Sequence, residues 1–345
     1  MRILHVLLSN QFSGAENVVC QIIDLYSGDK SYEMAYCSPD GQIRNALDER
    51  NIKFFPVSRG SLTELRRVIE AYDPDVIHAH DMGASFLTAL VCGKKRLISH
   101  IHNNSFDSRK LSLKSLLYFY AAKKSEHIFW VSRSSFEGYY FSSRLKGKSS
   151  VLYNVINVER LCQKSETDKN AYDYDVIYLG RLTDPKNPER LMRVCERIVK
   201  LHPTVKIAIV GDGDLGEQTR SLCNELGLDH NVTFLGFVSN PSKILKDARV
   251  MIMTSRWEGT PMCALESLAL GTPIVSTPVD GLRDIVFDGE NGYLSDDDDV
   301  IAKKIVEIIE NDSLYSSLSS CARDKALSYN DLGLYKARID EAYGD

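Results

Sequence analysis

Two glutamates eight positions apart, Glu258 and Glu266, have a spacing that suggests chemistry on a phosphorylated ligand. The apolar run 250–254 predicts a strand, so Glu258 should lie in the loop after it and Glu266 in the first turns of the next helix. A carboxylate in the loop suits the hydroxyls of a sugar, and one near the helix start suits ribose hydroxyls. The alternative is that Glu258 is a solvated loop acid and Glu266 a partner of the helix dipole.

The four residues after Glu258 would lead into that helix: Gly259, Thr260, Pro261 and Met262. Their backbone N–H groups would lie at a helix N-terminus, where the helix dipole and the unpaired amides favour an anion. This segment therefore predicts a site for a diphosphate.

Two cations, Arg181 and Lys186, follow another predicted strand at 176–179. Cations at this position would stabilise the negative charge of a departing nucleoside diphosphate. Each alone could be an ordinary surface cation. Because the strands of a parallel sheet end at one edge, the two cations and the two glutamates are expected to meet there.

In the first half of the chain, Gly14 lies in a loop that leads into a helix, where it would let backbone approach a ligand closely. Pairs of histidines end two strands: His78 with His80, and His100 with His102. Most of them are expected to be structural. His102 is the one we expect at the site, where it could polarise or hydrogen-bond a sugar hydroxyl.

The segment 211–216 matches G-x-G-x-x-G between a strand and a helix, which is the context of a dinucleotide fingerprint. The next strand, however, ends in Gly236, Phe237 and Val238, with no acid for an adenine ribose. A tight turn at Gly211 near a nucleotide is therefore favoured over a nicotinamide or flavin site.

Strands and helices alternate along the whole chain, which predicts an α/β fold with parallel sheets. The pattern breaks at about 157–175, where a polar stretch without periodicity fits a linker, and then restarts. We expect two Rossmann-like domains at 1–160 and 161–328. Residues 329–345 would form a helix that packs back on the first domain.

Composition agrees with two globular domains: the chain has 345 residues, of which 43% are hydrophobic and 26% charged. No apolar run approaches 18 residues, and the N-terminus is interpreted as a first strand and not as a signal peptide. Eight scattered cysteines without a Cys-x-x-Cys pair favour a reducing cytosol over a zinc site.

The net charge of −5 divides unevenly, with +5 in residues 1–150 and −10 in residues 151–345. Nucleic acid is not an expected partner. The segment 109–124 mixes basic and bulky apolar residues at helical spacing, which is typical of a helix on an anionic membrane surface. The alternative is a buried helix with charged ends.

Taken together, the Glu-x7-Glu motif, the 180–188 segment, the Gly14 loop and the 277–292 segment resemble family 4 retaining glycosyltransferases of the GT-B fold. The resemblance covers nearly the whole chain and is most specific over residues 176–295. It implies two Rossmann-like domains that face each other across a cleft, with the donor on the second and the acceptor on the first. It also implies that no metal or other cofactor is needed.

The resemblance further implies a role for each residue. Arg181 and Lys186 would bind the donor diphosphate, and Gly259, Thr260, Pro261 and Met262 would line the phosphates and sugar. Glu258 would contact the transferred sugar and Glu266 the ribose. Phe237 and Val238 would flank the base near Gly211. Gly14 and His102 would complete the site from the first domain. Two departures from the family pattern are Ser13, where Gly is common, and Asn187, where Gly often follows the lysine.

The expected reaction moves a hexose or N-acetylhexosamine from a nucleotide-diphosphate sugar to a saccharide or lipid-linked saccharide in bacterial cell-surface polysaccharide synthesis. A UDP-sugar is favoured as donor and GDP-mannose comes next. The enzyme would be cytoplasmic or peripheral on the inner face of the plasma membrane. Three alternatives remain: a sugar-nucleotide epimerase on the same fold, a dinucleotide-dependent oxidoreductase and a binding module without catalysis.

Overall fold

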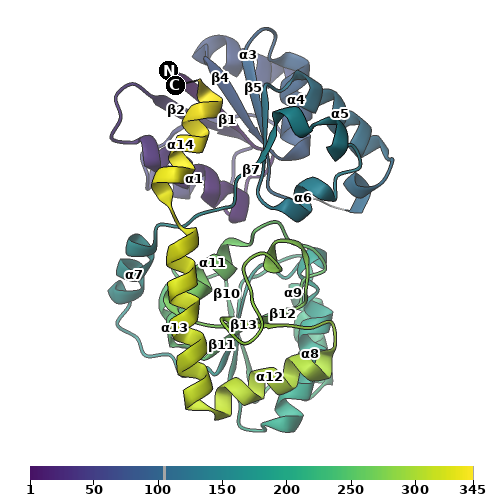
Figure 1. Ribbon diagram of the computed structural model, residues 1–345, viewed down its shortest axis with the longest axis vertical. Helices are drawn as coiled ribbons and strands as arrows, with labels where there is room; N and C mark the ends of the chain where they lie inside the picture. The colour runs from purple at the N-terminus through teal and green to yellow at the C-terminus, as the bar shows by residue number, and fades with distance from the viewer. Residues whose placement is uncertain (104–105, 345) are drawn as a thin grey trace. The chain divides into compact units, whose positions relative to one another are not determined.

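The computed structural model describes residues 1–103 and 106–344, which divide into two compact α/β units. The first unit contains residues 1–154 and the chain from Leu332 onward, and the second contains Val155–Asp331. Figure 1 shows that each unit is a sheet with helices packed against it. The boundaries expected from the sequence, after residues 160 and 328, fall inside helices of the second unit.

The described part of the first unit holds one seven-stranded parallel sheet in the order β3-β2-β1-β4-β5-β6-β7. Its strands are β1 Arg2–Val6, β2 Glu33–Ser38, β3 Lys53–Pro56, β4 Val76–His80, β5 Arg96–Ile101, β6 His127–Trp130 and β7 Ser149–Val151. Its α-helices are α1 Gly14–Tyr26, α2 Ile43–Asp48, α3 Leu62–Tyr72, α4 Asp81–Val91, α5 Leu113–Lys124, α6 Arg133–Glu137 and α14 Leu332–Tyr343. Three 3₁₀ turns complete it: η1 Phe106–Arg109, η2 Ser142–Arg144 and η3 Lys146–Lys148.

The second unit repeats this plan with a six-stranded parallel sheet in the order β10-β9-β8-β11-β12-β13. Its strands are β8 Val176–Leu179, β9 Ile207–Val210, β10 Val232–Gly236, β11 Val250–Met253, β12 Ile274–Ser276 and β13 Gly292–Leu294. Its helices are α7 Val158–Thr167, α8 Pro188–Leu201, α9 Gly216–Glu225, α10 Ser242–Asp247, α11 Met262–Leu270, α12 Asp298–Glu310 and α13 Asp312–Tyr329, with 3₁₀ turns η4 Asp184–Lys186 and η5 Asp280–Leu282.

In both sheets the chain starts at the centre, runs to one edge and then returns to build the other side. The strand order therefore reverses between β1 and β4 in the first unit and between β8 and β11 in the second. Ligands of open α/β sheets bind at the carboxyl ends of the strands beside such a reversal. The expectation of doubly wound parallel sheets is confirmed.

Central strands are apolar on both faces because helices cover both sides of each sheet. Val176, Ile207 and Val250 on neighbouring strands of the second sheet are fully buried. The first sheet departs from this rule, since four buried histidines lie on its strands and a fifth, His102, directly follows β5, each at most 9% exposed.

Local signals in the sequence set several helix starts. Ser61 caps α3 and its side chain accepts a hydrogen bond from the backbone N–H of Glu64, as the Ser-x-x-Glu pattern predicts. In the acidic run 296–299, Asp297 caps α12 by accepting from two backbone N–H groups. That run is therefore a solvated helix entry, as a cluster of aspartates at a helix start indicates.

The linker expected at 157–175 is wrong in part, because α7 occupies 158–167. Asn157 caps this helix by accepting from the backbone N–H of Arg160, and Leu161 and Ser165 turn inward. Because its buried side consists of one leucine and one serine, the sequence shows no apolar periodicity over this helix. Residues 168–174 are the irregular connection to β8.

The last helix, α14, belongs to the first unit although the whole second unit precedes it in the chain. The Tyr343 hydroxyl lies 2.8 Å from Nδ1 of His78, and the Arg96 guanidinium donates to the backbone carbonyls of Ala342 and Tyr343. Tyr26 of α1 donates to Asp340 at 2.5 Å. Among the described residues, no helix combines the length and apolar character that a membrane span requires.

Candidate active site

Four loops meet at the carboxyl edge of the second sheet, beside its strand reversal. They follow β8, β9, β11 and β12. The residues that the sequence places on the second domain lie on these loops, except Met262 and Glu266 in α11 and the pair that follows β10. The loops are joined by hydrogen bonds between their backbones. Arg256 N–H donates to the Pro185 carbonyl at 2.8 Å, and Leu182 N–H donates to the Asp212 carbonyl at 3.1 Å.

At the centre of this edge, Lys186 and Glu258 form an ion pair with 2.5 Å between Nζ and Oε1. The pair is largely shielded from solvent, with the side chains 17% and 9% exposed. Ser255 donates a second hydrogen bond to the same carboxylate oxygen at 2.6 Å. Burial alone would lower the pKa of Lys186, but the adjacent Glu258 carboxylate outweighs it and holds that pKa above its ordinary value.

The backbone beside Lys186 explains one departure from the family pattern. Asn187 has φ 53° and ψ 58°, a left-handed conformation that glycine adopts freely and that asparagine tolerates better than other residues. The Thr254 hydroxyl donates to the Asn187 carbonyl at 3.2 Å and fixes the turn on β11. Asparagine therefore supports the same turn that glycine would form.

Glycines let these loops approach one another closely. A side chain on Gly281 would place its Cβ 1.7 Å from the Gly259 carbonyl oxygen, and one on Gly211 would be 2.1 Å from that of Gly180. Gly211 also has φ 125°, which L side chains rarely adopt. The G-x-G turn thus packs the β9 loop on the β8 loop, so its glycines have a structural use that needs no dinucleotide.

The helix α11 begins at Met262 and directs its N-terminus at this edge, with Pro261 at the cap position. Thr260, Pro261 and Met262 are buried. Glu266, one turn into α11, is half-buried, and burial raises its pKa to about 7 while Lys164 on α7 partly opposes that shift. At neutral pH this group can both donate and accept hydrogen bonds.

The remaining donor-side residues border the edge. Arg181 is exposed, and its carbonyl accepts from the buried Tyr178 hydroxyl at 2.9 Å. Phe237 has 71% of its surface exposed, and Val238 beside it is half-buried. The Gly211 N–H donates to the Gly236 carbonyl at 2.7 Å, which ties this pair to the β9 loop. An exposed aromatic ring at a sheet edge offers a face on which a nucleobase can stack.

In the first unit, Gly14 is the exposed first residue of α1. Ser13, the other departure from the family pattern, has φ −143° and therefore needs no glycine. It forms a capping box: the Glu16 carboxylate accepts from the Ser13 backbone N–H at 3.1 Å and from its hydroxyl at 2.5 Å.

His102 does not stand alone at its strand end. Its Nε2 lies 2.9 Å from Nδ1 of His80, whose Nε2 lies 3.0 Å from Nδ1 of His5. The His78 ring packs against those of His5 and His80, and the His100 ring packs against those of His80 and His102. His78 and His100 also stack on each other, so five imidazoles form one buried group on one face of the sheet, which we call the histidine stack.

Burial lowers the pKa of every member of the histidine stack, to about 4 for His102. The rings are therefore neutral at pH 7. Two trios of the stack bring ring nitrogens within 4.8 Å of one another, a separation at which imidazoles can share a metal ion. One trio is His5, His78 and His80, and the other is His80, His100 and His102.

Sequence reasoning identified the histidine pairs but missed the stack that includes His5. The available signal was the alternation of histidine at every second position on strands that neighbour one another. It also missed Ser255 and Thr254, because hydroxyl residues that hold a charged side chain or a turn have no distinctive spacing.

Two family models match the chain with this geometry. Residues 160–325 match the model for glycosyl transferases group 1, and residues 15–160 match that for glycosyltransferase family 4. The chain is a family 4 glycosyltransferase of the GT-B fold.

Relatives and solved structures agree with this assignment. The glycosyltransferase is 29% identical to the uncharacterized glycosyltransferase MJ1059 of Methanocaldococcus jannaschii, over 72% of this chain and 70% of that protein. It is 23% identical to the UDP-Gal:alpha-D-GlcNAc-diphosphoundecaprenol alpha-1,3-galactosyltransferase of Escherichia coli, over 95% and 89%. Its fold is similar to that of Anabaena HepE crystallised with UDP-glucose, with TM-score 0.86, 21% identity and coverage of 100% and 99%.

None of these findings supports the epimerase, oxidoreductase or binding-module alternatives.

Proposed function

We propose that this glycosyltransferase moves a hexose or N-acetylhexosamine from a UDP-sugar to a saccharide or lipid-linked saccharide, with retention of the anomeric configuration, in bacterial cell-surface polysaccharide synthesis. The observation that carries the proposal is the shielded Lys186–Glu258 ion pair beside the N-terminus of α11. The E. coli relative named for UDP-Gal and a diphosphoundecaprenol acceptor supports the donor and the acceptor class, and the HepE complex with UDP-glucose supports the donor.

In this reaction the bond between the sugar C1 and the phosphate oxygen breaks, and an acceptor oxygen bonds to C1 on the same face. The acceptor proton leaves with the nucleoside diphosphate. Lys186, Arg181 and the first amides of α11 stabilise the charge that grows on the departing diphosphate. Because these groups supply positive charge, the proposal includes no metal ion and no cofactor.

The other residues orient the donor and the acceptor. Glu258, held by Lys186 and Ser255, presents its carboxylate to a sugar hydroxyl. Glu266 takes the ribose hydroxyls, and Phe237 stacks on the base with Val238 beside it. Gly259, Thr260, Pro261 and Met262 line the phosphates and sugar, and Gly211 keeps the β9 loop in place. We assign the acceptor to the first unit, where Gly14 and His102 lie at the carboxyl edge of the sheet.

We also propose that the glycosyltransferase acts in the cytoplasm on the inner face of the plasma membrane. All eight cysteines are free, as in a reducing compartment. Four exposed apolar residues of α5 form a stripe at spacings of three and four, which we call the α5 stripe: Leu113, Leu116, Leu117 and Tyr120. Lysines flank it, as in helices that lie on anionic lipid.

The test is a thermal-shift panel of UDP, GDP, ADP, their sugars and NAD(P)H with EDTA present, followed by product analysis with and without an added divalent ion. We expect UDP and one UDP-sugar to stabilise the protein, and the product to keep the donor's anomeric configuration in its proton coupling constants. Stabilisation only by NAD(P)H, an epimer formed from donor alone, or activity that requires an added divalent ion would overturn the proposal.

A further inference from the structure

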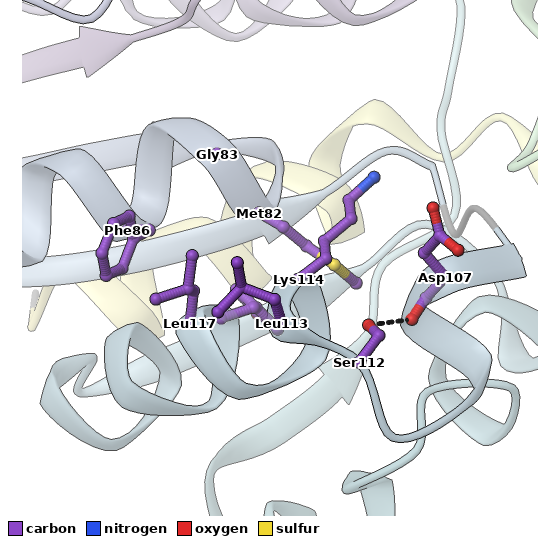
Figure 2. A pocket seen from close by; sticks show the side chains of 9 residues that line it. Met82, Gly83, Phe86, Asp107, Ser112, Leu113, Lys114 and Leu117 are labelled. Carbon is purple, nitrogen blue, oxygen red and sulfur yellow. Dashed lines mark hydrogen bonds between the residues drawn. The ribbon is translucent and has the colours of Figure 1, made fainter.

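A cavity of about 430 Å³ lies between α4 and α5 in the first unit. Figure 2 shows the side chains that line it. They come from α4, η1 and the start of α5: Met82, Gly83, Phe86, Asp107, Ser112, Leu113, Lys114, Leu117 and Tyr118. This volume falls within the range of small-molecule sites, and most of the wall is apolar, as in such sites.

The cavity has one polar end and one apolar end. In Figure 2 Asp107, Ser112 and the ammonium of Lys114 lie toward one end, and Phe86 lies at the other. The polar end lies at the carboxyl edge of the first sheet, because α4 begins directly after β4. A ligand that fills this cavity should therefore carry a charged group near the catalytic edge and a hydrocarbon part away from it.

The walls are held in place by their own contacts. Tyr118 is buried, and its hydroxyl lies 3.0 Å from that of Ser99 on β5. The Phe86 ring packs edge-on against Tyr120, with 6.3 Å between ring centroids. The Ser112 hydroxyl donates to the Asp107 carbonyl and joins η1 to the start of α5. The cavity is thus built before any ligand arrives.

The apolar wall continues onto the surface. Leu113 and Leu117 line the cavity and also belong to the α5 stripe, with 72% and 36% of their surfaces exposed. A hydrocarbon chain that enters from a bilayer beneath α5 would stay in contact with leucine along its path. Apart from Lys114, Asp107 and Ser112, the lining offers few groups that could bind the hydroxyls of a free sugar.

We propose that this cavity binds the first part of the acceptor's hydrocarbon chain, with Lys114 facing the phosphate to which the chain is joined. The proposal rests on the proposed function, since it specifies the acceptor as a lipid phosphate. Lys114 also lies near the Asp81 carboxyl, whose pKa burial raises to about 6 against the opposing effect of that cation.

The experiment titrates the full chain by calorimetry with geranyl phosphate, farnesyl phosphate and farnesol, each below its micelle concentration. Burial of one methylene favours binding roughly fourfold. We therefore expect farnesyl phosphate to bind at a ratio of one and at least tenfold more tightly than geranyl phosphate. Farnesol should bind about tenfold more weakly than farnesyl phosphate, because it lacks the charge. Equal affinity for the two chain lengths, or binding only to vesicles, overturns the proposal.

Leu117→Trp fills the apolar part of the cavity and should weaken farnesyl phosphate at least tenfold. Leu90→Trp, at an exposed leucine of α4 outside the lining, is its control and should leave the affinity within twofold. Lys114→Gln should weaken the binding of farnesyl phosphate but not that of farnesol. Lys94→Gln, at an exposed lysine, should weaken the binding of neither ligand. An unchanged affinity in Leu117→Trp overturns the proposal.

A UDP titration of every variant separates the two proposals. If UDP binds normally but farnesyl phosphate does not bind, only the proposal of a hydrocarbon-chain site in this cavity is overturned. If the unaltered protein does not bind UDP, the proposed function is overturned, whether or not farnesyl phosphate binds. Melting curves identify a variant that has not folded, in which case Leu117→Phe replaces Leu117→Trp.

Discussion

At the scale of single residues, the Lys186–Glu258 pair combines charge, burial and position in one contact. A cation that faces a departing diphosphate needs to remain charged although it is shielded from water. Glu258 keeps Lys186 protonated. Lys186 and Ser255 both donate hydrogen bonds to one carboxylate oxygen of Glu258 and so orient its side chain.

We expect Lys186→Gln and Glu258→Gln each to lower kcat by about 10²–10³-fold, because each removes a group placed to act in the transition state. Initial rates with the UDP-sugar that stabilises the protein provide the measurement. The pair Lys200 and Glu196 on α8, with side chains 68% and 27% exposed, supplies matched controls, and glutamine at either position should leave the rate unchanged. Near-normal turnover in both site variants would contradict the assignment.

The sequence revealed the glutamates, the cations and the glycines of the second unit because parallel strands bring their ends to one edge. It could not reveal why Asn187 replaces glycine, since the answer is a backbone angle. Nor could it show that His102 belongs to a stack, because each pair of histidines by itself is an ordinary strand end.

At the scale of elements, strands β1, β4 and β5 carry the histidine stack, and its burial couples stability to pH. In the unfolded chain each histidine has a pKa near 6.5, but in the folded protein that of His5 is about 3 and that of His102 about 4. Below pH 6.5 the unfolded state therefore binds more protons, and the stability present above pH 6.5 is lost as pH falls toward 4.

We expect the free energy of unfolding to fall on acidification from pH 6.5 toward 4, by up to about 1.4 kcal/mol per pH unit for each buried histidine. Asp81 and Glu266 act in the opposite direction, since burial raises their pKa values to about 6 and 7. Urea unfolding across this range measures the slope. His5→Gln should reduce it, whereas His230→Gln, at an exposed site, should not. A stability independent of pH over this range would contradict the expectation.

In helix α5 the apolar pattern of the sequence predicts the helix but not which of its faces is buried. Its buried side consists of Ser115, Tyr118, Ala121 and Ala122, so the helix covers the core with small residues and one tyrosine. The leucines of the α5 stripe are therefore left on the surface. The sequence alone could not separate the two faces because both are apolar. It missed α7 because the buried side of that helix is short and partly polar, with Leu161 and Ser165.

If the α5 stripe lies on lipid, Leu113→Glu combined with Leu116→Glu should reduce co-sedimentation with anionic vesicles at least tenfold. Apolar burial and the attraction of the neighbouring lysines both contribute to this binding. Leu201→Glu, at a leucine of α8 that is 49% exposed, is the control. No binding of the unaltered protein to anionic vesicles at low salt would refute membrane contact.

At the scale of the whole molecule, the two units have the same plan but different charge, +5 over residues 1–150 and −10 over residues 151–345. An acidic unit can bind an anionic donor, as we propose, only where cations gather locally, and Arg181 and Lys186 both follow β8. The basic first half suits an acceptor held at an anionic surface.

Removal of α14 by ending the chain at Asp331 should affect the two units differently. The first unit would lose the contacts of Tyr343 with His78 and of Arg96 with the last turn, whereas the second would keep its sheet. We expect a lower melting temperature for the first unit and unchanged UDP affinity. Tyr343→Phe, which removes one hydrogen bond, should cost about 1 kcal/mol. If the shortened chain loses both the stability of the first unit and the affinity for UDP, the two units do not depend on α14 differently, and the expectation is contradicted.

The position of α14 also has a consequence during synthesis. The ribosome makes residues 1–154 first, yet the helix that covers His78 emerges only after the whole second unit. Until then the nascent first unit lacks the cover that α14 gives to His78 and Tyr26 in the finished enzyme. The whole second unit must therefore be translated before the first unit is complete, and a messenger that stops within the second unit would yield a first unit without α14.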